Sequence, residues 1–132
     1  MKQLLSLVIF IFLLTPFVNA MQNERDSTVI LQTKTGNIEG SLLIPTNFQT
    51  GELVILISGS GPTDRDGNNP MMKNNSLKKL AYHLADSGFA VLRFDKRGIA
   101  ASKSALVSES LLRFDDYVAD VVSWIAYMRS NK

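Results

Sequence analysis

The apolar residues that follow the first 25 positions begin with a pattern typical of paired strands. Residues 27–33 (STVILQT) and 37–44 (NIEGSLLI) are rich in β-branched and aliphatic side chains, and Thr35 and Gly36 lie between them. Two such runs joined by a short glycine-containing turn predict an antiparallel β-hairpin. The folded part of the chain is therefore expected to begin with two paired strands.

The next two apolar runs do not alternate. Every residue of 53–57 (LVILI) is apolar, and 89–94 (FAVLRF) is mostly apolar. A strand with both faces covered has this pattern, which is typical of parallel sheets flanked by helices. We expect 53–57 to be a central strand of such a sheet and 89–94 to be a second strand.

A helix is predicted between these two strands. Asn75 or Ser76 can cap its first turn, and Gly88 fits the left-handed position that ends a helix. Together with the flanking strands it forms a β-α-β unit, whose crossover should be right-handed. The residues expected on its buried face are Leu77, Leu80, Ala81 and Leu84.

A second helix is predicted from about Phe114. Asp115 and Asp116 lie in its first turn, where the helix dipole favours negative charge. Its expected buried stripe consists of Phe114, Val118, Val121, Val122, Ile125 and Met128.

The second helix should lead into another parallel strand, and the sequence ends at Lys132 before one is reached. We therefore expect the chain to hold the first half of a parallel-sheet α/β domain, with 53–57 left as an open edge. Such an edge could pair with a second copy or another chain. A complete small α+β domain is the alternative.

The first twenty residues, 1–20 (MKQLLSLVIFIFLLTPFVNA), have the pattern of a secretory signal peptide. Lys2 precedes an apolar stretch over 4–14, and after Pro16 the residues 18–20 (VNA) have the small-residue pattern of a cleavage site. The apolar stretch is shorter than the roughly 20 residues that span a bilayer, which argues against a membrane anchor. We expect cleavage after Ala20 and a secreted or periplasmic protein.

Composition narrows the classes of function. The 132 residues are 45% hydrophobic and 20% charged, as in a single globular domain, and the net charge is +2 without a run of Lys or Arg. Nucleic-acid binding is therefore not expected. The absence of cysteine excludes disulfides, thiolate metal sites, a catalytic Cys and a lipidated Cys.

Two polar loops follow the predicted parallel strands, at the end of the sheet where open α/β sheets bind ligands. They are 58–69 (SGSGPTDRDGNN) and 94–102 (FDKRGIAAS). With these loops the sequence resembles the α/β-hydrolase superfamily, in particular exported esterases and serine-aminopeptidase-like (S33) hydrolases with a GSGPTDRDGN loop. The resemblance covers about 31–132. It implies the N-terminal half of an α/β-hydrolase fold and hydrolysis of a small ester or peptide through an acyl-serine intermediate, without metal or cofactor.

In that family the first loop directs a backbone N–H at the substrate oxyanion. Gly59 and Gly61 permit backbone angles that other residues avoid, and Pro62 fixes the following turn. The resemblance makes the N–H groups of Ser60 and Gly61 the candidate oxyanion donors. A plain glycine-rich turn is the alternative.

The rest of the first loop, Asp64, Arg65, Asp66 and Gly67, is expected to shape it. The spacing does not fit a calcium loop of the EF-hand type, which needs Gly at the sixth position and Glu at the twelfth. We expect Asp side chains to bond the turn backbone and Arg65 to pair with a neighbouring carboxylate.

The second loop resembles the D-x-R-G-x-G-x-S turn of the family, in which the charged pair is structural. Asp95, Arg97 and Gly98 match this turn, whereas Ala100 stands where Gly is usual. If that position needs a positive φ, alanine would be strained there by about 1 kcal/mol.

No catalytic triad is recognised in the chain. The family places its serine in G-x-S-x-G, followed by an acid and then a histidine. Ser60 lies between glycines on a different loop, and His83, the single histidine, is predicted to face solvent from the first helix. The chain is thus expected to be an inactive N-terminal portion lacking the nucleophile elbow. A secreted non-catalytic binding module built on a half sheet is the alternative.

Overall fold

A computed structural model describes residues 25–46, 48–49 and 51–131, so the predicted signal peptide lies outside the described residues. None of the helices in these ranges is both long and apolar enough to span a membrane. The elements are β1 (Arg25–Thr33), β2 (Gly36–Ile44), β3 (Leu53–Leu56), α1 (Ser76–Asp86), β4 (Ala90–Phe94), the 3-10 helices η1 (Ala100–Ala105) and η2 (Glu109–Leu111), and α2 (Phe114–Ser130).

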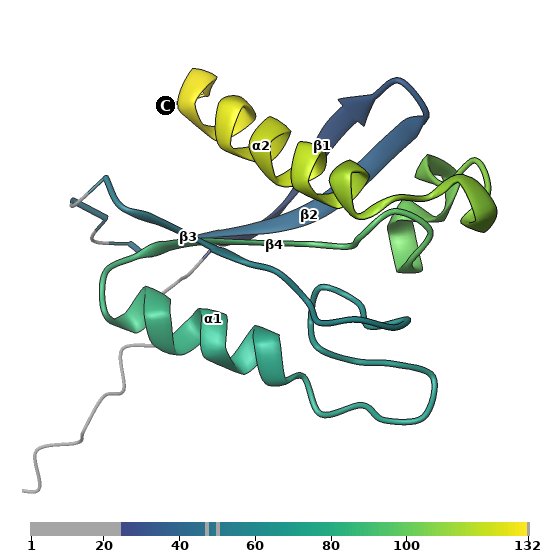
Figure 1. The fold of residues 1–132 in the computed structure, drawn as a ribbon. Coiled ribbons are helices and arrows are strands. Elements are labelled where there is room, and N and C mark those ends of the chain that lie inside the picture. Colours follow the sequence, from purple (N-terminus) through teal and green to yellow (C-terminus); the bar gives the residue numbers. More distant parts are fainter. Residues whose placement is uncertain (1–24, 47, 50, 132) are drawn as a thin grey trace, which may run out of the picture.

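The strands form one four-stranded mixed sheet in the order β1-β2-β4-β3. β1 pairs with β2 and β2 with β4 in antiparallel fashion, while β3 and β4 are parallel. Figure 1 shows α1 on one face of this sheet and α2 on the other. The predicted hairpin and the predicted β-α-β unit are therefore both present.

In the described sheet β3 forms the open edge that the sequence predicts for this chain, so 53–57 is not a central strand of that sheet. β4 is central, between β2 and β3, and all five of its residues are buried. β3 lies at the edge and its residues are only partly buried, while Ile57 beyond its end is 52% exposed. A continuous apolar run indicates that both faces of a strand are covered by helices. It does not indicate whether another strand pairs with each of its two edges.

Two apolar cores lie on the two faces of the sheet, and β4 contributes to both. Alternate residues of a strand point to opposite faces. The core beside α2 consists of Leu31, Ile38, Leu92, Phe94, Ala105 and Trp124. The core beside α1 consists of Leu43, Ala81, Ala85 and Val91.

Helix α1 turns most of its predicted face to the sheet, with Ala81 buried and Leu84 packed against the core, and Leu80 is the exception. Ala81 and Ala85 are fully buried, whereas Leu80 is 45% exposed. The backbone carbonyl of Asp66 accepts hydrogen bonds from the first turn of the helix, and no side chain of Asn75 caps it. Gly88 follows the helix at a φ of 95°, as its left-handed position requires.

The predicted buried stripe of α2 is largely wrong. Phe114 is 79% exposed, and three more members of the stripe, Val118, Val122 and Ile125, are exposed as well. The helix instead buries Trp124 and Asp120, with Val121, Tyr127 and Met128 packed partly against the core. Helical spacing identifies residues that share a face, but the choice of face depends on the partners that each face finds on the sheet.

Trp124 has aromatic partners that help to set this choice. Its ring lies 5.8 Å from the ring of Phe94 on β4 and 5.5 Å, edge to face, from that of Tyr127. Burial of a tryptophan with such contacts is worth more than burial of the smaller valines. The burial of Trp124 therefore sets the rotation of α2 about its own axis.

The location of the core predicts different costs for two leucine truncations. Leu92→Ala should lower the free energy of unfolding by about 2–5 kcal/mol because it empties a fully buried site. Leu80→Ala, on the exposed side of α1, should cost less than about 1 kcal/mol. Urea unfolding can be followed through the fluorescence of Trp124, the single tryptophan. Equal costs would contradict the observed face of α1.

Candidate functional site

A cavity of about 650 Å³ lies where the chain leaves β3 and β4. The two loops that the sequence singled out meet there, beside the first turn of α2. Most of the remaining wall is apolar. The cavity is lined by Ile57, Ser58, Gly59, Ser60, Gly61, Pro62, Lys96, Arg97, Gly98, Ile99, Leu106, Glu109, Leu112, Phe114 and Tyr117.

The glycine-rich loop presents its backbone to this cavity. Ser60 and Gly61 are exposed, and Gly61 has a φ of 85°, which favours glycine. Within the described part of the chain, the N–H groups of these two residues donate no hydrogen bond. A hydrogen bond from the Ser58 hydroxyl to the carbonyl of Thr63 (3.1 Å) closes the base of the loop. The two amides can thus bind an acceptor in the cavity.

Lys96 holds this loop, and the sequence reasoning did not identify it. Its ammonium donates hydrogen bonds to the carbonyls of Gly59 and Gly61, the latter at 3.1 Å. Lys96 is 9% exposed, and burial lowers the pKa of its ammonium. Its place in the D-x-R-G turn is the variable one, so the motif drew no attention to it. A lysine directly after a buried strand was the available signal.

The polar half of the first loop is bonded mainly to itself. Asp64 accepts hydrogen bonds from the backbone N–H groups of Asp66 (2.9 Å) and Asn68 (2.8 Å). Gly67 is buried with a φ of 90°, and a side chain there would collide with Ser76 at the start of α1. These contacts give the loop one conformation and join it to the helix.

Asp95 links the first loop to the second. Its carboxylate accepts the backbone N–H of Arg65 (2.7 Å) and that of Ala101 (3.2 Å). The Arg65 side chain pairs with Glu39 of β2 at 2.5 Å and lies 3.8 Å from Asp95. Burial raises the pKa of the Asp95 carboxyl, and the hydrogen bond and charge of Arg65 oppose that shift.

Arg93 on β4 provides a second link that the sequence reasoning missed. Its side chain is 1% exposed and pairs with Asp26 of β1 (2.7 Å) and with Asp66 of the first loop (3.1 Å). A single arginine inside an otherwise apolar strand was the available signal, since a buried guanidinium requires carboxylate partners. The pair with Asp66 fixes the loop to the sheet.

Arg97 connects three segments beside the cavity, namely α2, the hairpin turn and η1. It makes two hydrogen bonds to the Asp120 carboxylate on α2, at 2.5 and 2.6 Å. It also donates to Thr35 in the hairpin turn and to the carbonyl of Ala105 (3.2 Å). Burial raises the pKa of the Asp120 carboxyl, and the hydrogen bond and charge of Arg97 oppose this. The resemblance implies a structural role for Arg97, and its contacts are of that kind.

The backbone at Ala100 has the positive φ at which alanine would be strained. Ala100 has a φ of 42°, and Gly98 has one of 80°. A Cβ on Gly98 would lie 2.6 Å from the side chain of Leu106, so glycine is required there by space as well. The second loop therefore keeps a left-handed turn at Ala100 in spite of the side chain.

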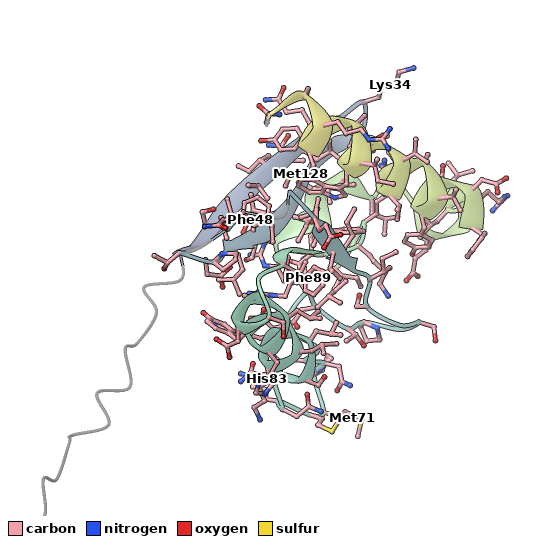
Figure 2. All side chains as sticks on the ribbon, turned by 90° about the vertical axis from the view of Figure 1, so that its left-hand side faces the viewer. Lys34, Phe48, Met71, His83, Phe89 and Met128 are labelled. Atoms are coloured by element: carbon pink, nitrogen blue, oxygen red, sulfur yellow. The ribbon has the colours of Figure 1, made fainter. Side chains whose placement is uncertain are left out.

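His83 takes no part in the cavity. It lies on the exposed side of α1, and Figure 2 shows it on the side of the helix away from the sheet, as predicted. It does not line the cavity. Among the described residues, no group of three or more His, Cys, Asp or Glu side chains is arranged to hold a metal ion.

Comparison with known proteins gives one match in sequence. The chain is 35% identical to Esterase EstD of Thermotoga maritima over 74 residues, which make up 56% of this chain and 16% of the esterase. This match supports a relationship to α/β hydrolases. The chain thus spans only a small part of the length of the curated relative it matches. No protein-family model matches it.

A solved structure described as an alpha-beta serine hydrolase homologue from Coxiella burnetii is also similar. The TM-score is 0.45 at 23% sequence identity, over 83% of this chain and 45% of that chain.

The buried ion pair of Arg97 predicts a large effect on stability. Arg97→Ala should lower the free energy of unfolding by about 3–5 kcal/mol, because it leaves the Asp120 carboxylate buried without a counter-charge. Arg97→Lys should recover only part of this, since an ammonium cannot bond both carboxylate oxygens in parallel. Arg129→Ala, in the exposed last turn of α2, is the control and should cost less than about 1 kcal/mol. Urea unfolding measures all three, and a cost for Arg97→Ala no larger than that of the control would contradict the prediction.

The strained alanine predicts a gain in stability. Ala100→Gly should raise the free energy of unfolding by up to about 1 kcal/mol, because it relieves the left-handed strain and loses part of that gain to chain entropy. Ala101→Gly, at the next residue and without a positive φ, should lower it by about 0.5–1 kcal/mol. Thermal unfolding by circular dichroism compares the two variants. The same sign for both would show that the backbone of Ala100 is unstrained.

Proposed function

We propose that this chain is the N-terminal part of an exported serine hydrolase of the S33-like type, which cleaves ester or peptide bonds through an acyl-serine intermediate. The observation that carries the proposal is that Ser60 and Gly61 are exposed, line the cavity beyond the parallel strands and donate no N–H hydrogen bond within the described residues. The sequence similarity to an esterase supports the same class of reaction.

In this proposal the two amides stabilise charge that develops during acyl transfer. When a serine oxygen attacks the substrate carbonyl carbon, the carbonyl oxygen becomes an oxyanion. The N–H groups of Ser60 and Gly61 donate to that oxygen, each contributing about 3 kcal/mol in the transition state. The reaction itself needs no metal or organic cofactor.

The serine, the acid and the histidine of the triad are proposed to come from polypeptide beyond this chain, which is then inactive alone. The open edge of β3 supports this proposal, because a parallel strand could pair with it. The outward apolar side chains of α2 support it too, since further structure would cover them.

Export is proposed from the signal-peptide pattern of residues 1–20, with cleavage after Ala20 and a secreted or periplasmic location. The mass of the intact protein recovered from an exporting host tests this. A mass that still includes residues 1–20 would contradict it.

The oxyanion role can be tested by removing one N–H group. The gene is first translated beyond codon 132 in all three frames, and a product containing G-x-S-x-G is assayed with p-nitrophenyl butyrate. Ser60→Pro deletes the backbone N–H, whereas Ser60→Ala keeps it. Ser60→Pro should lower kcat by about 10²–10³-fold, and Ser60→Ala should leave it nearly unchanged.

The control is this chain alone, which should show no turnover that phenylmethylsulfonyl fluoride abolishes. Equal losses in the two Ser60 variants would contradict the role of the amide. If no frame encodes G-x-S-x-G, the secreted non-catalytic binding module becomes the better proposal, with its open β3 edge and outward α2 face as binding surfaces.

A further inference from the structure

The ammonium of Lys96 is the main restraint on the glycine-rich loop. Within the described residues, the hydrogen bonds made by residues 59–62 are those that Lys96 donates to the carbonyls of Gly59 and Gly61. Residues 59–62 are otherwise exposed. Above the Ser58–Thr63 hydrogen bond at its base, the conformation of this loop therefore depends on one side chain, which comes from the turn that follows β4.

The two bonds determine where the Ser60 amide points. The C=O of Gly59 and the N–H of Ser60 belong to one peptide group, and a trans peptide directs them to opposite sides. With the carbonyl held by Lys96, the N–H is turned away from the ammonium. The second bond fixes the peptide group between Gly61 and Pro62, so the loop is held at two points on either side of the Ser60–Gly61 peptide.

Lys96 is unusual in having no carboxylate partner. No Asp or Glu among the described residues lies within ion-pair distance of its ammonium, although the side chain is 9% exposed. A buried cation without a counter-charge is unfavourable, so a fold that only needed to fill this space would use an apolar side chain. Backbone carbonyls alone hold this charge.

We infer that Lys96 is a positioning residue, whose ammonium orients the backbone N–H of Ser60 toward the cavity. The inference rests on the proposed function for its catalytic meaning, since the oriented group is the proposed oxyanion donor. The orientation of the Ser60 N–H by Lys96 is a property of this chain, so it can be measured without an assay of catalytic activity.

The test compares side chains of similar size with and without the ammonium in the full, isotope-labelled chain. Lys96→Met keeps an unbranched side chain of similar length and removes the three N–H donors. Backbone order parameters of Ser60 and Gly61 should fall from near 0.85 to below about 0.6, because the loop loses its two restraints. The ¹³C shifts of the Gly59 and Gly61 carbonyls should change in the same spectra. Lys103→Met, at an exposed lysine of η1, is the control and should change neither.

Chemical rescue separates the charge from the packing. The chain has no cysteine, so Lys96→Cys creates a single thiol that 2-bromoethylamine alkylates in the unfolded protein. The product carries an ammonium at nearly the lysine position. After refolding, it should restore the order parameters and the carbonyl shifts, whereas unmodified Lys96→Cys should not.

If Lys96→Met does not fold, as judged by circular dichroism, the alkylated and unmodified Lys96→Cys proteins provide the comparison. A loop that stays ordered in Lys96→Met, or alkylation that restores nothing, would overturn the inference whatever the catalytic activity. The proposed hydrolase function fails separately, through the Ser60→Pro assay.

Discussion

Charged side chains are buried at the end of the central strand, and their need for partners organises the loops around the cavity. Arg93 and Asp95 are each 1% exposed, and Lys96 follows them. Charges removed from water are tolerated only when ion pairs and hydrogen bonds replace their hydration. Because these partners lie on β1, on both loops and on backbone carbonyls, satisfying the charges brings the separate segments together.

This arrangement explains why the two loops meet at one place. Asp95 accepts an N–H from each loop, and Asp66 accepts from Arg93 on the sheet. Arg97 extends the same network to Asp120 on α2 and to the hairpin turn. The cavity wall is therefore built on the rigid sheet, which is the condition for holding donors in a preorganised geometry.

The described part of the chain leaves sheet edges unpaired and several apolar side chains of α2 exposed. β1 and β3 form the two edges of the described sheet, and β3 is the edge that lies beside the parallel strand β4. Helix α2 places Trp124 inward and a row of apolar residues outward.

Local signals in the sequence predicted the hairpin, the β-α-β unit and the end of α1. A short turn between two strand-like runs and a glycine after a helix act through neighbouring residues, so no distant partner is needed to interpret them. The candidate loop was also recognisable, because its glycines permit backbone angles that other residues avoid, wherever they occur in a chain. At Ala100 the sequence raised the question of strain, and the positive φ that causes it came from the structure.

Only the tertiary structure decided which face of α2 is buried, which strand is central and which lysine holds the loop. Phe114 lies on the apolar face of α2 that spacing predicts, yet Trp124 is the residue of this helix that is fully buried. Lys96 gained its role from two carbonyls 35 and 37 positions earlier in the chain. Periodicity records which side chains share a surface. Which of these surfaces is buried depends on contacts between residues far apart in sequence. A local sequence pattern carries no information about such contacts.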